Sequence, residues 1–157
     1  RAELPSAISA RTPRHITHDE LVRLAEWKMA RGVFRPRNLV LVRGNPAEDV
    51  QRTSERALAR IPDPKGPIAE LVRLAGVGPA TASAVVSAAA PDCYPFFDDL
   101  VAAQVPGLGR IDFTVAFFVR YAGALRERAM QLGAGWTPVG VERSLWANAG
   151  GKAGKRA

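Results

Sequence analysis

The chain of 157 residues contains a single cysteine, Cys93, and only two histidines, His15 and His18. One thiol excludes an intramolecular disulfide framework and any four-cysteine zinc or iron–sulfur site. The two histidines have no partner residues at a metal-binding spacing, so we interpret them as surface residues. We therefore expect no transition metal.

Long apolar runs are also missing. No stretch approaches the ~18 residues of a membrane span, and the longest, over residues 84–90, is mostly alanine. No secretory signal is visible. We expect no membrane partner. We expect a location in the bacterial cytoplasm, or otherwise inside a cell together with DNA, and the bacterial part rests on the high content of Ala, Arg and Gly.

Positive charge is in excess, with 22 Lys and Arg against 15 Asp and Glu and a formal net charge of +7. Such an excess favours polyanionic partners, because a protein that neutralises phosphates releases condensed counterions. A solvated arginine-rich surface would explain the same excess. The charge thus indicates a nucleic acid without establishing one.

Apolar residues recur at helical spacing and strand-like alternation is absent, which predicts a compact all-α fold. Thr17 and Glu20 form the clearest start, a capping box before a helix that ends near Arg31. Asn45 with Pro46 is a second capping signal. The predicted helices cover 17–31, 39–42, 46–60, about 63–74, 79–90, a short segment from Asp98 or Asp99, 111–132 and 137–146.

The length allows one domain. We expect an extended N-terminal segment over residues 1–16, one helical domain over 17–148, and a basic flexible tail over 149–157. The tail consists mainly of Gly, Ala, Lys and Arg, a composition that is typical of disorder.

A hairpin at Gly76-Val77-Gly78 is the most informative segment. Glycines two apart allow two helices to join through a tight turn and leave no side chain between the main chain and a phosphate. Pro79 suits the first position of the next helix, and the free amides and the helix dipole there attract anions. Val77 is expected to turn inward. The predicted nucleic-acid-binding residues here are Gly76, Val77, Gly78, Pro79, Ala80 and Thr81. The alternative is a structural corner without a ligand.

A second basic segment runs over residues 31–37, Arg-Gly-Val-Phe-Arg-Pro-Arg. Arg31, Arg35 and Arg37 are candidates for phosphate contacts, and Phe34 for stacking on a base. A solvated linker between two helices would explain the segment equally well.

The pattern Leu-x-Gly-Val-Gly-x-x-Thr-Ala over residues 74–82 resembles the hairpin of the helix-hairpin-helix (HhH-GPD) DNA glycosylase superfamily, which excises damaged or mispaired bases. In that family an aspartate follows the hairpin threonine at a nearly fixed distance, and here Asp98 lies seventeen residues after Thr81. The resemblance is specific over residues 68–101. It implies a glycosylase-like helical fold and DNA as the partner, with RNA as the alternative; it implies nothing about the oligomeric state.

The resemblance implies that Asp98 stabilises positive charge on the sugar as the base leaves, with Asp99 as the alternative if the loop shifts by one residue. Either aspartate can instead be a helix cap. Family members that also cleave the strand carry a lysine where this chain has Ala80, so hydrolysis alone is expected. A monovalent cation on the hairpin carbonyls is implied as well, and no other cofactor is expected.

Excision requires the base to leave the stack and enter a pocket. Trp27, Phe96 and Phe97 are candidates for stacking on it, and core packing is the alternative for each. The sequence thus predicts a monofunctional DNA N-glycosylase. The alternatives are a non-catalytic helix-hairpin-helix module that binds DNA or RNA, and a scaffold whose hairpin contacts protein.

Overall fold

The computed structural model describes residues 3–156, apart from the side chains of residues 155 and 156. Throughout that range the regular secondary structure is helical, which confirms the all-α prediction. None of the helices described is long and apolar enough to cross a membrane. The helices are α1 (Leu4–Ser9), α2 (His18–Arg31), α3 (Pro36–Arg43), α4 (Ala47–Leu58), α5 (Gly66–Leu71), α6 (Pro79–Ala89), α7 (Asp99–Ala102), α8 (Val115–Leu132), α9 (Pro138–Asn148) and α10 (Gly151–Arg156).

Threonine hydroxyls cap the N-termini of α2, α8 and α9. The Thr17 hydroxyl accepts the Glu20 amide at the start of α2, as predicted, and Thr137 does the same for the Gly140 amide in α9. Thr114 was not predicted as a cap. It accepts the Phe117 amide, so α8 begins at Val115 and not at Ile111. Each cap satisfies one of the amides that the first helical turn leaves without an internal partner.

Three further boundaries differ from the prediction. Pro36 occupies the first turn of α3, where its missing N–H is not needed, so this helix begins before Leu39. The N-terminal segment is not wholly extended, because α1 forms within it and packs on α6. The described part of the C-terminal segment, predicted as a flexible tail, contains α10, which packs on α7 and α9.

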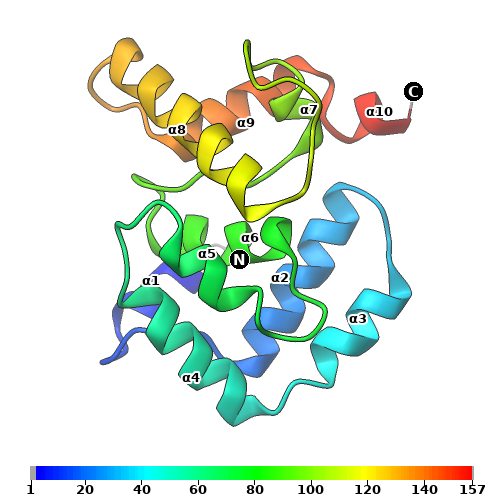
Figure 1. Ribbon diagram of the computed structural model, residues 1–157, viewed down its shortest axis with the longest axis vertical. Helices are drawn as coiled ribbons and strands as arrows, with labels where there is room; N and C mark the ends of the chain where they lie inside the picture. Colours follow the sequence, from blue (N-terminus) through cyan, green and yellow to red (C-terminus); the bar gives the residue numbers. More distant parts are fainter. Residues whose placement is uncertain (1–2, 157) are drawn as a thin grey trace.

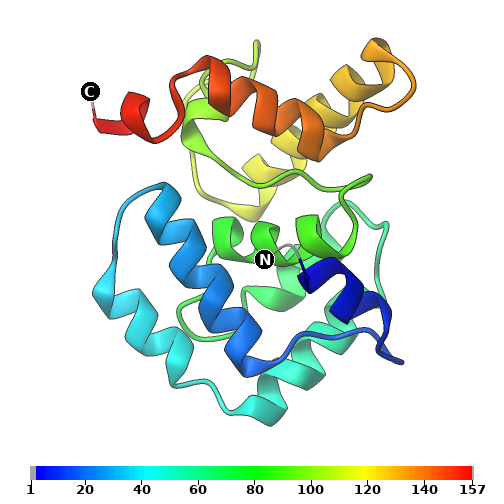
Figure 2. The same cartoon turned by 180° about the vertical axis from the view of Figure 1, so that it is seen from behind.

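The helices form two lobes (Figures 1 and 2). Helices α1 to α6 make the lower lobe of these views, and α7 to α10 make the upper lobe. Helix α6 lies inside the lower lobe against α1, α2 and α5, and its residues from Ala80 to Ala88 are all buried. Alanine and serine predominate in α6, and small side chains allow neighbouring helices to approach closely.

The segment between α6 and α7 joins the lobes. The Phe97 amide donates to Ser83 Oγ of α6 at 2.8 Å, while the Phe97 ring packs against Phe117, Phe118 and Tyr121 of α8. The Tyr121 hydroxyl donates to the Phe96 carbonyl at 2.6 Å. Burial raises the pKa of Tyr121 well above its usual value, and the nearby Glu142 carboxylate adds to that effect, so the phenol stays protonated and can donate. This segment therefore fixes one lobe against the other.

The Arg11–Glu20 ion pair ties the N-terminal segment to α2, and it makes stability depend on pH. Burial alone would raise the pKa of Glu20, but the hydrogen-bonded Arg11 guanidinium and the contact with Thr17 hold that pKa below its usual value of 4.5. Because the pKa is lower in the folded than in the unfolded chain, the stabilisation is complete above the usual pKa and is lost as the pH falls through the folded-state pKa.

We expect Glu20→Gln to lower the free energy of unfolding by about 1 kcal/mol at neutral pH. The difference from the wild type should shrink as the pH falls below 4.5. Urea denaturation at pH 7 and pH 3 measures both values. An equal difference at the two pH values would contradict the assignment.

Candidate nucleic-acid interface

The hairpin approaches α3 at a distance that only glycine allows. Gly76 has φ +73°, and a Cβ added there would lie 2.6 Å from the Asn38 carbonyl oxygen and 2.9 Å from the Val42 amide nitrogen. Both the left-handed backbone and the contact require the absence of a side chain. Val77 turns inward and is buried, as predicted.

Asn45 holds the hairpin from the junction of α3 and α4. Its side-chain oxygen accepts the Ala75 amide at 2.9 Å, and its side-chain nitrogen donates to the Ala75 carbonyl at 2.9 Å. The same nitrogen donates to the Val42 carbonyl at 3.0 Å. The prediction that Asn45 caps α4 was wrong, because Pro46 takes the capping position and no side chain caps that helix. Asn45 instead fixes the turn that precedes α6.

The other side of the hairpin is open. Gly78 is exposed, and a Cβ built there would meet nothing within 4 Å. Gly78 is the N-cap of α6 and Pro79 is its first residue. The main-chain amides of Gly78, Ala80 and Thr81 have no hydrogen-bond acceptor among the described residues. These amides, at the positive end of the α6 dipole, are suited to an anion.

A cavity of about 570 Å³ lies between the lobes beside these amides. The lower lobe contributes the hairpin, the first turn of α6, and parts of α2 and the α2–α3 loop, including Lys28 and Arg35. The upper lobe contributes the segment that leads into α7, together with Phe113 and Gly154. The structure thus brings together the hairpin, Arg35, Phe96, Phe97, Asp98 and Asp99, all of which the sequence analysis selected.

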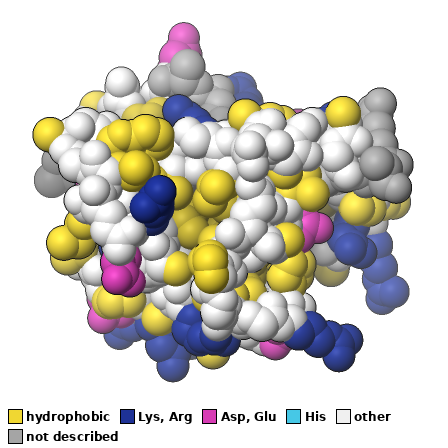
Figure 3. Space-filling model, turned by 90° about the horizontal axis from the view of Figure 1, so that it is seen from above, with side chains coloured by type: hydrophobic (Ala, Val, Ile, Leu, Met, Phe, Trp, Pro, Cys, Tyr) yellow, Lys and Arg dark blue, Asp and Glu magenta, His cyan; other side chains and the backbone are white. Residues whose placement is uncertain are grey.

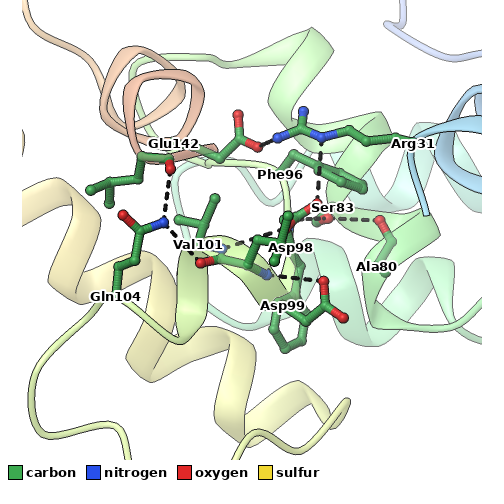
Figure 4. A network of polar contacts seen from close by, with 12 residues as sticks. Arg31, Ala80, Ser83, Phe96, Asp98, Asp99, Val101, Gln104 and Glu142 are labelled. Atoms are coloured by element: carbon green, nitrogen blue, oxygen red, sulfur yellow. Dashed lines mark hydrogen bonds and ion pairs between the residues drawn. The ribbon is translucent and has the colours of Figure 1, made fainter. Parts of the chain in front are cut away.

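Asp98 is the N-cap of α7, which confirms the capping interpretation of this residue. Its Oδ1 accepts the Leu100 amide at 2.8 Å and the Val101 amide at 3.4 Å (Figure 4). The residue lines the cavity, yet only 1% of its surface is exposed. Asp99 follows as the first residue of α7; it is exposed and also lines the cavity.

Arg31 does not face a phosphate, which corrects its predicted role. Its guanidinium donates to Glu142 of α9 in a short hydrogen bond, and its Nε lies 3.4 Å from Asp98 Oδ2 (Figure 4). The guanidinium carbon lies 4.4 to 5.5 Å from the ring centres of Trp27, Phe96 and Trp146. A side chain enclosed by two carboxylates and three rings is not available to a polyanion, so Arg31 is not part of the candidate interface.

The three predicted stacking residues are used in packing. Trp27 and Phe96 meet edge to face at 4.8 Å, and Phe97 is buried among the rings of the upper lobe. Core packing therefore accounts for all three. The aromatic ring that the cavity does expose belongs to Phe113, which stacks on Phe97 at 4.7 Å and is 49% exposed. Sequence reasoning missed it because the predicted helix over 111–132 included Phe113, whereas α8 begins at Val115.

The α2–α3 loop and the first turn of α3 carry the remaining predicted contacts on the outside of the molecule. Phe34 is 65% exposed, and Val33 and Arg35 line the cavity between the lobes. Arg35 and Arg37 are both exposed, and neither forms an ion pair with any residue that the structure describes. Arg35 thus adds positive charge beside the hairpin, whereas Phe34 lines a second hollow with residues of α2 and Lys152.

The face of the upper lobe over α7 to α10 carries little charge. Seen from above, over α7 to α10, the face is largely uncharged, and most Lys and Arg side chains stand toward its lower and right-hand edges (Figure 3). Within residues 3–156 no group of three or more His, Cys, Asp or Glu side chains could hold a metal ion.

Comparisons with protein-family models, with curated proteins and with solved structures give no match for this chain.

The two hairpin glycines should differ when a methyl group is added. We expect Gly76→Ala to lower the free energy of unfolding by about 2 kcal/mol or more, because the new Cβ meets main-chain atoms and the backbone is left-handed. Gly78→Ala should change it by less than about 0.5 kcal/mol, because the space is open. Urea denaturation of both variants is the measurement. Equal losses would contradict the distinction between a packed and an open glycine.

Proposed function

We propose that this protein binds DNA through the hairpin and hydrolyses the base–sugar bond of a nucleotide placed in the cavity between the lobes. The observation that carries the proposal is the position of the open amides of Gly78, Ala80 and Thr81 at the edge of a cavity that Asp98 also lines. Amides that can bind the DNA backbone thus lie close to a carboxylate, and excision of a base requires both.

Phosphate binding is supported by main-chain geometry and by charge. An anionic oxygen at Gly78 would meet unpaired amides at the start of an eleven-residue helix, with no side chain in its path. Arg35 on the neighbouring α2–α3 loop and Arg37 in the first turn of α3 can contact flanking phosphates. The exposed Phe34 ring, on the same loop, can stack on a base.

The cavity is suited to an aromatic ligand of nucleoside size. Its volume of about 570 Å³ lies within the range of small-ligand pockets. The exposed Phe113 ring provides a flat apolar wall. A base extruded from the stack could lie against Phe113 with its sugar toward the first turn of α7.

The chemistry proposed for Asp98 is electrostatic and hydrolytic. Cleavage of an N-glycosidic bond develops positive charge on the sugar, which a fixed carboxylate stabilises, and the carboxylate can also orient a water. Ala80, the second residue of α6, takes the position of the family's lyase lysine, so the proposal is limited to hydrolysis. The monovalent cation expected on the hairpin carbonyls stays a prediction.

A non-catalytic module that binds DNA or RNA is the second candidate, and one observation favours it. The Asp98 side chain is fully covered, with Oδ1 on two amides and Oδ2 facing Arg31. A carboxylate with these contacts stabilises α7 even if it never meets a substrate. The two candidates share the hairpin and differ in the role of Asp98.

Gly78→Glu tests the hairpin in both candidates. A carboxylate at the open position repels a phosphate, so the Kd for a fluorescein-labelled 20-base-pair duplex should rise at least about tenfold while folding is retained. Ala59→Glu is the matched control, because it adds the same charge at the exposed end of α4, which does not line the cavity. Fluorescence anisotropy at two salt concentrations gives the Kd values. Equal Kd values for the two variants would exclude the hairpin as the contact.

Asp98→Asn separates the enzyme from the binding module. Asparagine is also a good helix cap, so α7 should persist, whereas abasic-site formation on a panel of duplexes with modified or mispaired bases should fall at least about 100-fold with the Kd unchanged. Asp99→Asn is the matched control and should keep most of the activity. If the wild type forms no abasic sites on any duplex that it binds, the binding module is the better description.

A further inference from the structure

Three charged side chains from three helices meet beside the cavity and are almost completely covered (Figure 4). Arg31 ends α2 in the lower lobe, Asp98 caps α7, and Glu142 lies on α9 in the upper lobe. Their side-chain exposures are 10%, 0% and 2%, respectively. Charges buried this far are costly unless they are paired, so the arrangement of the pairs determines what each group can do.

The two carboxylates hold Arg31 unequally. The terminal nitrogen Nη2 donates to Glu142 Oε1 in a short hydrogen bond. The Nε nitrogen lies 3.4 Å from Asp98 Oδ2, within ion-pair distance, but it has no hydrogen-bond acceptor among the described residues. Arg31 therefore attracts Asp98 electrostatically while its hydrogen bond goes to Glu142.

Aromatic rings limit where the guanidinium can move. The guanidinium carbon of Arg31 lies 4.4 Å from the ring centre of Trp146, 4.9 Å from that of Phe96 and 5.5 Å from that of Trp27. Withdrawal into solvent would require these rings to separate. The remaining motion of Arg31 is a small shift between its two carboxylate partners.

Two hydrogen bonds from Arg31 would prevent the Asp98 carboxylate from acting on a substrate. Arginine binds carboxylates best through two parallel hydrogen bonds, and such a pair would occupy the second oxygen of Asp98, whose first oxygen already accepts two amides. Glu142 prevents that pair of hydrogen bonds, because it accepts from Nη2 on the side of the guanidinium away from Asp98. Without the Glu142 carboxylate, the guanidinium would turn toward the one carboxylate left to it.

We infer that Arg31 and Glu142 are positioning residues for Asp98, with Arg31 keeping the carboxylate in place through charge and Glu142 keeping Arg31 from binding both of its oxygens. The catalytic consequence of this inference rests on the proposed function, whereas the positions of the three side chains do not. Neither Arg31 nor Glu142 lines the cavity.

Glu142→Gln is the central test, because it removes the carboxylate and keeps the shape. In this variant we expect the Arg31 Nε–H resonance in ¹H–¹⁵N spectra to move downfield as it forms a hydrogen bond to Asp98. On a duplex that the wild type processes, the single-turnover excision rate should fall at least about tenfold, with the Kd unchanged within about twofold. Arg31→Lys, which keeps the charge, should retain more excision activity than Arg31→Gln. Glu127→Gln, on the exposed side of α8, is the matched control and should change neither reading.

The outcomes separate this inference from the proposed function. An Arg31 resonance that is unchanged in Glu142→Gln overturns the inference, whatever the activity. A rate that falls only together with DNA affinity and melting temperature overturns it too, because a merely structural role explains that result. If Glu142→Gln does not fold, Glu142→Asp shortens the reach of the carboxylate, and its Arg31 resonance must shift in the same direction. If the wild type excises no base, the proposed function fails, and the resonance still decides how Asp98 is held.

Discussion

The close approach of the hairpin to α3 is the constraint on which the candidate interface depends. At Gly76 the main chain lies against the Asn38 carbonyl and the Val42 amide, where no other residue has room. Asn45 binds both polar groups of Ala75 from the same side. With one side of the turn fixed against α3 and α4, its other side leaves Gly78 and the first amides of α6 open at the cavity. The turn is therefore rigid where it packs and accessible where a ligand would lie, as preorganised binding requires.

A second constraint joins the lobes. The cavity has walls from both, so its shape depends on how α7 to α10 sit on α1 to α6. The main chain of Phe96 and Phe97 sets that position, because it binds Ser83 in the lower lobe and Tyr121 in the upper lobe. The Arg31 cluster adds an ionic contact from α2 to α7 and α9. Because the cluster is covered, separating the lobes would expose three charges and several aromatic rings together. The arrangement that covers Asp98 therefore also holds the cavity in shape.

Local signals in the sequence predicted much of the fold. The Thr17 cap, the tight turn at 76–78 with its inward Val77, and the start of α6 at Pro79 were all predicted correctly, because each depends on neighbours within a few residues. Thr114 is also a local signal and was missed beside the more obvious apolar pattern of 111–132. Helix α10 could not be predicted, since two of its six residues are glycine and its packing on α7 and α9 is what supports it.

The candidate site was predicted less completely, because its contacts are distant in sequence. Arg31 looked like part of a solvated basic loop, and its partner Glu142 is 111 residues away. Asn45 carried a convincing capping pattern, yet its side chain serves Ala75, thirty residues further on. No pattern in the chain announces either contact. Pairings of this kind need the folded arrangement, whereas the hairpin and Asp98 could be selected from spacing and resemblance.

The central claim is that the open amides at the start of α6 hold a phosphate. Titration of ¹⁵N-labelled protein with a short DNA duplex tests it most directly, because each amide reports separately. The account predicts that the Gly78, Ala80 and Thr81 amides shift downfield, that these shifts are among the largest in the spectrum, and that they are reversed by added salt. Large shifts confined to other regions, with these three amides unmoved at saturation, would contradict it.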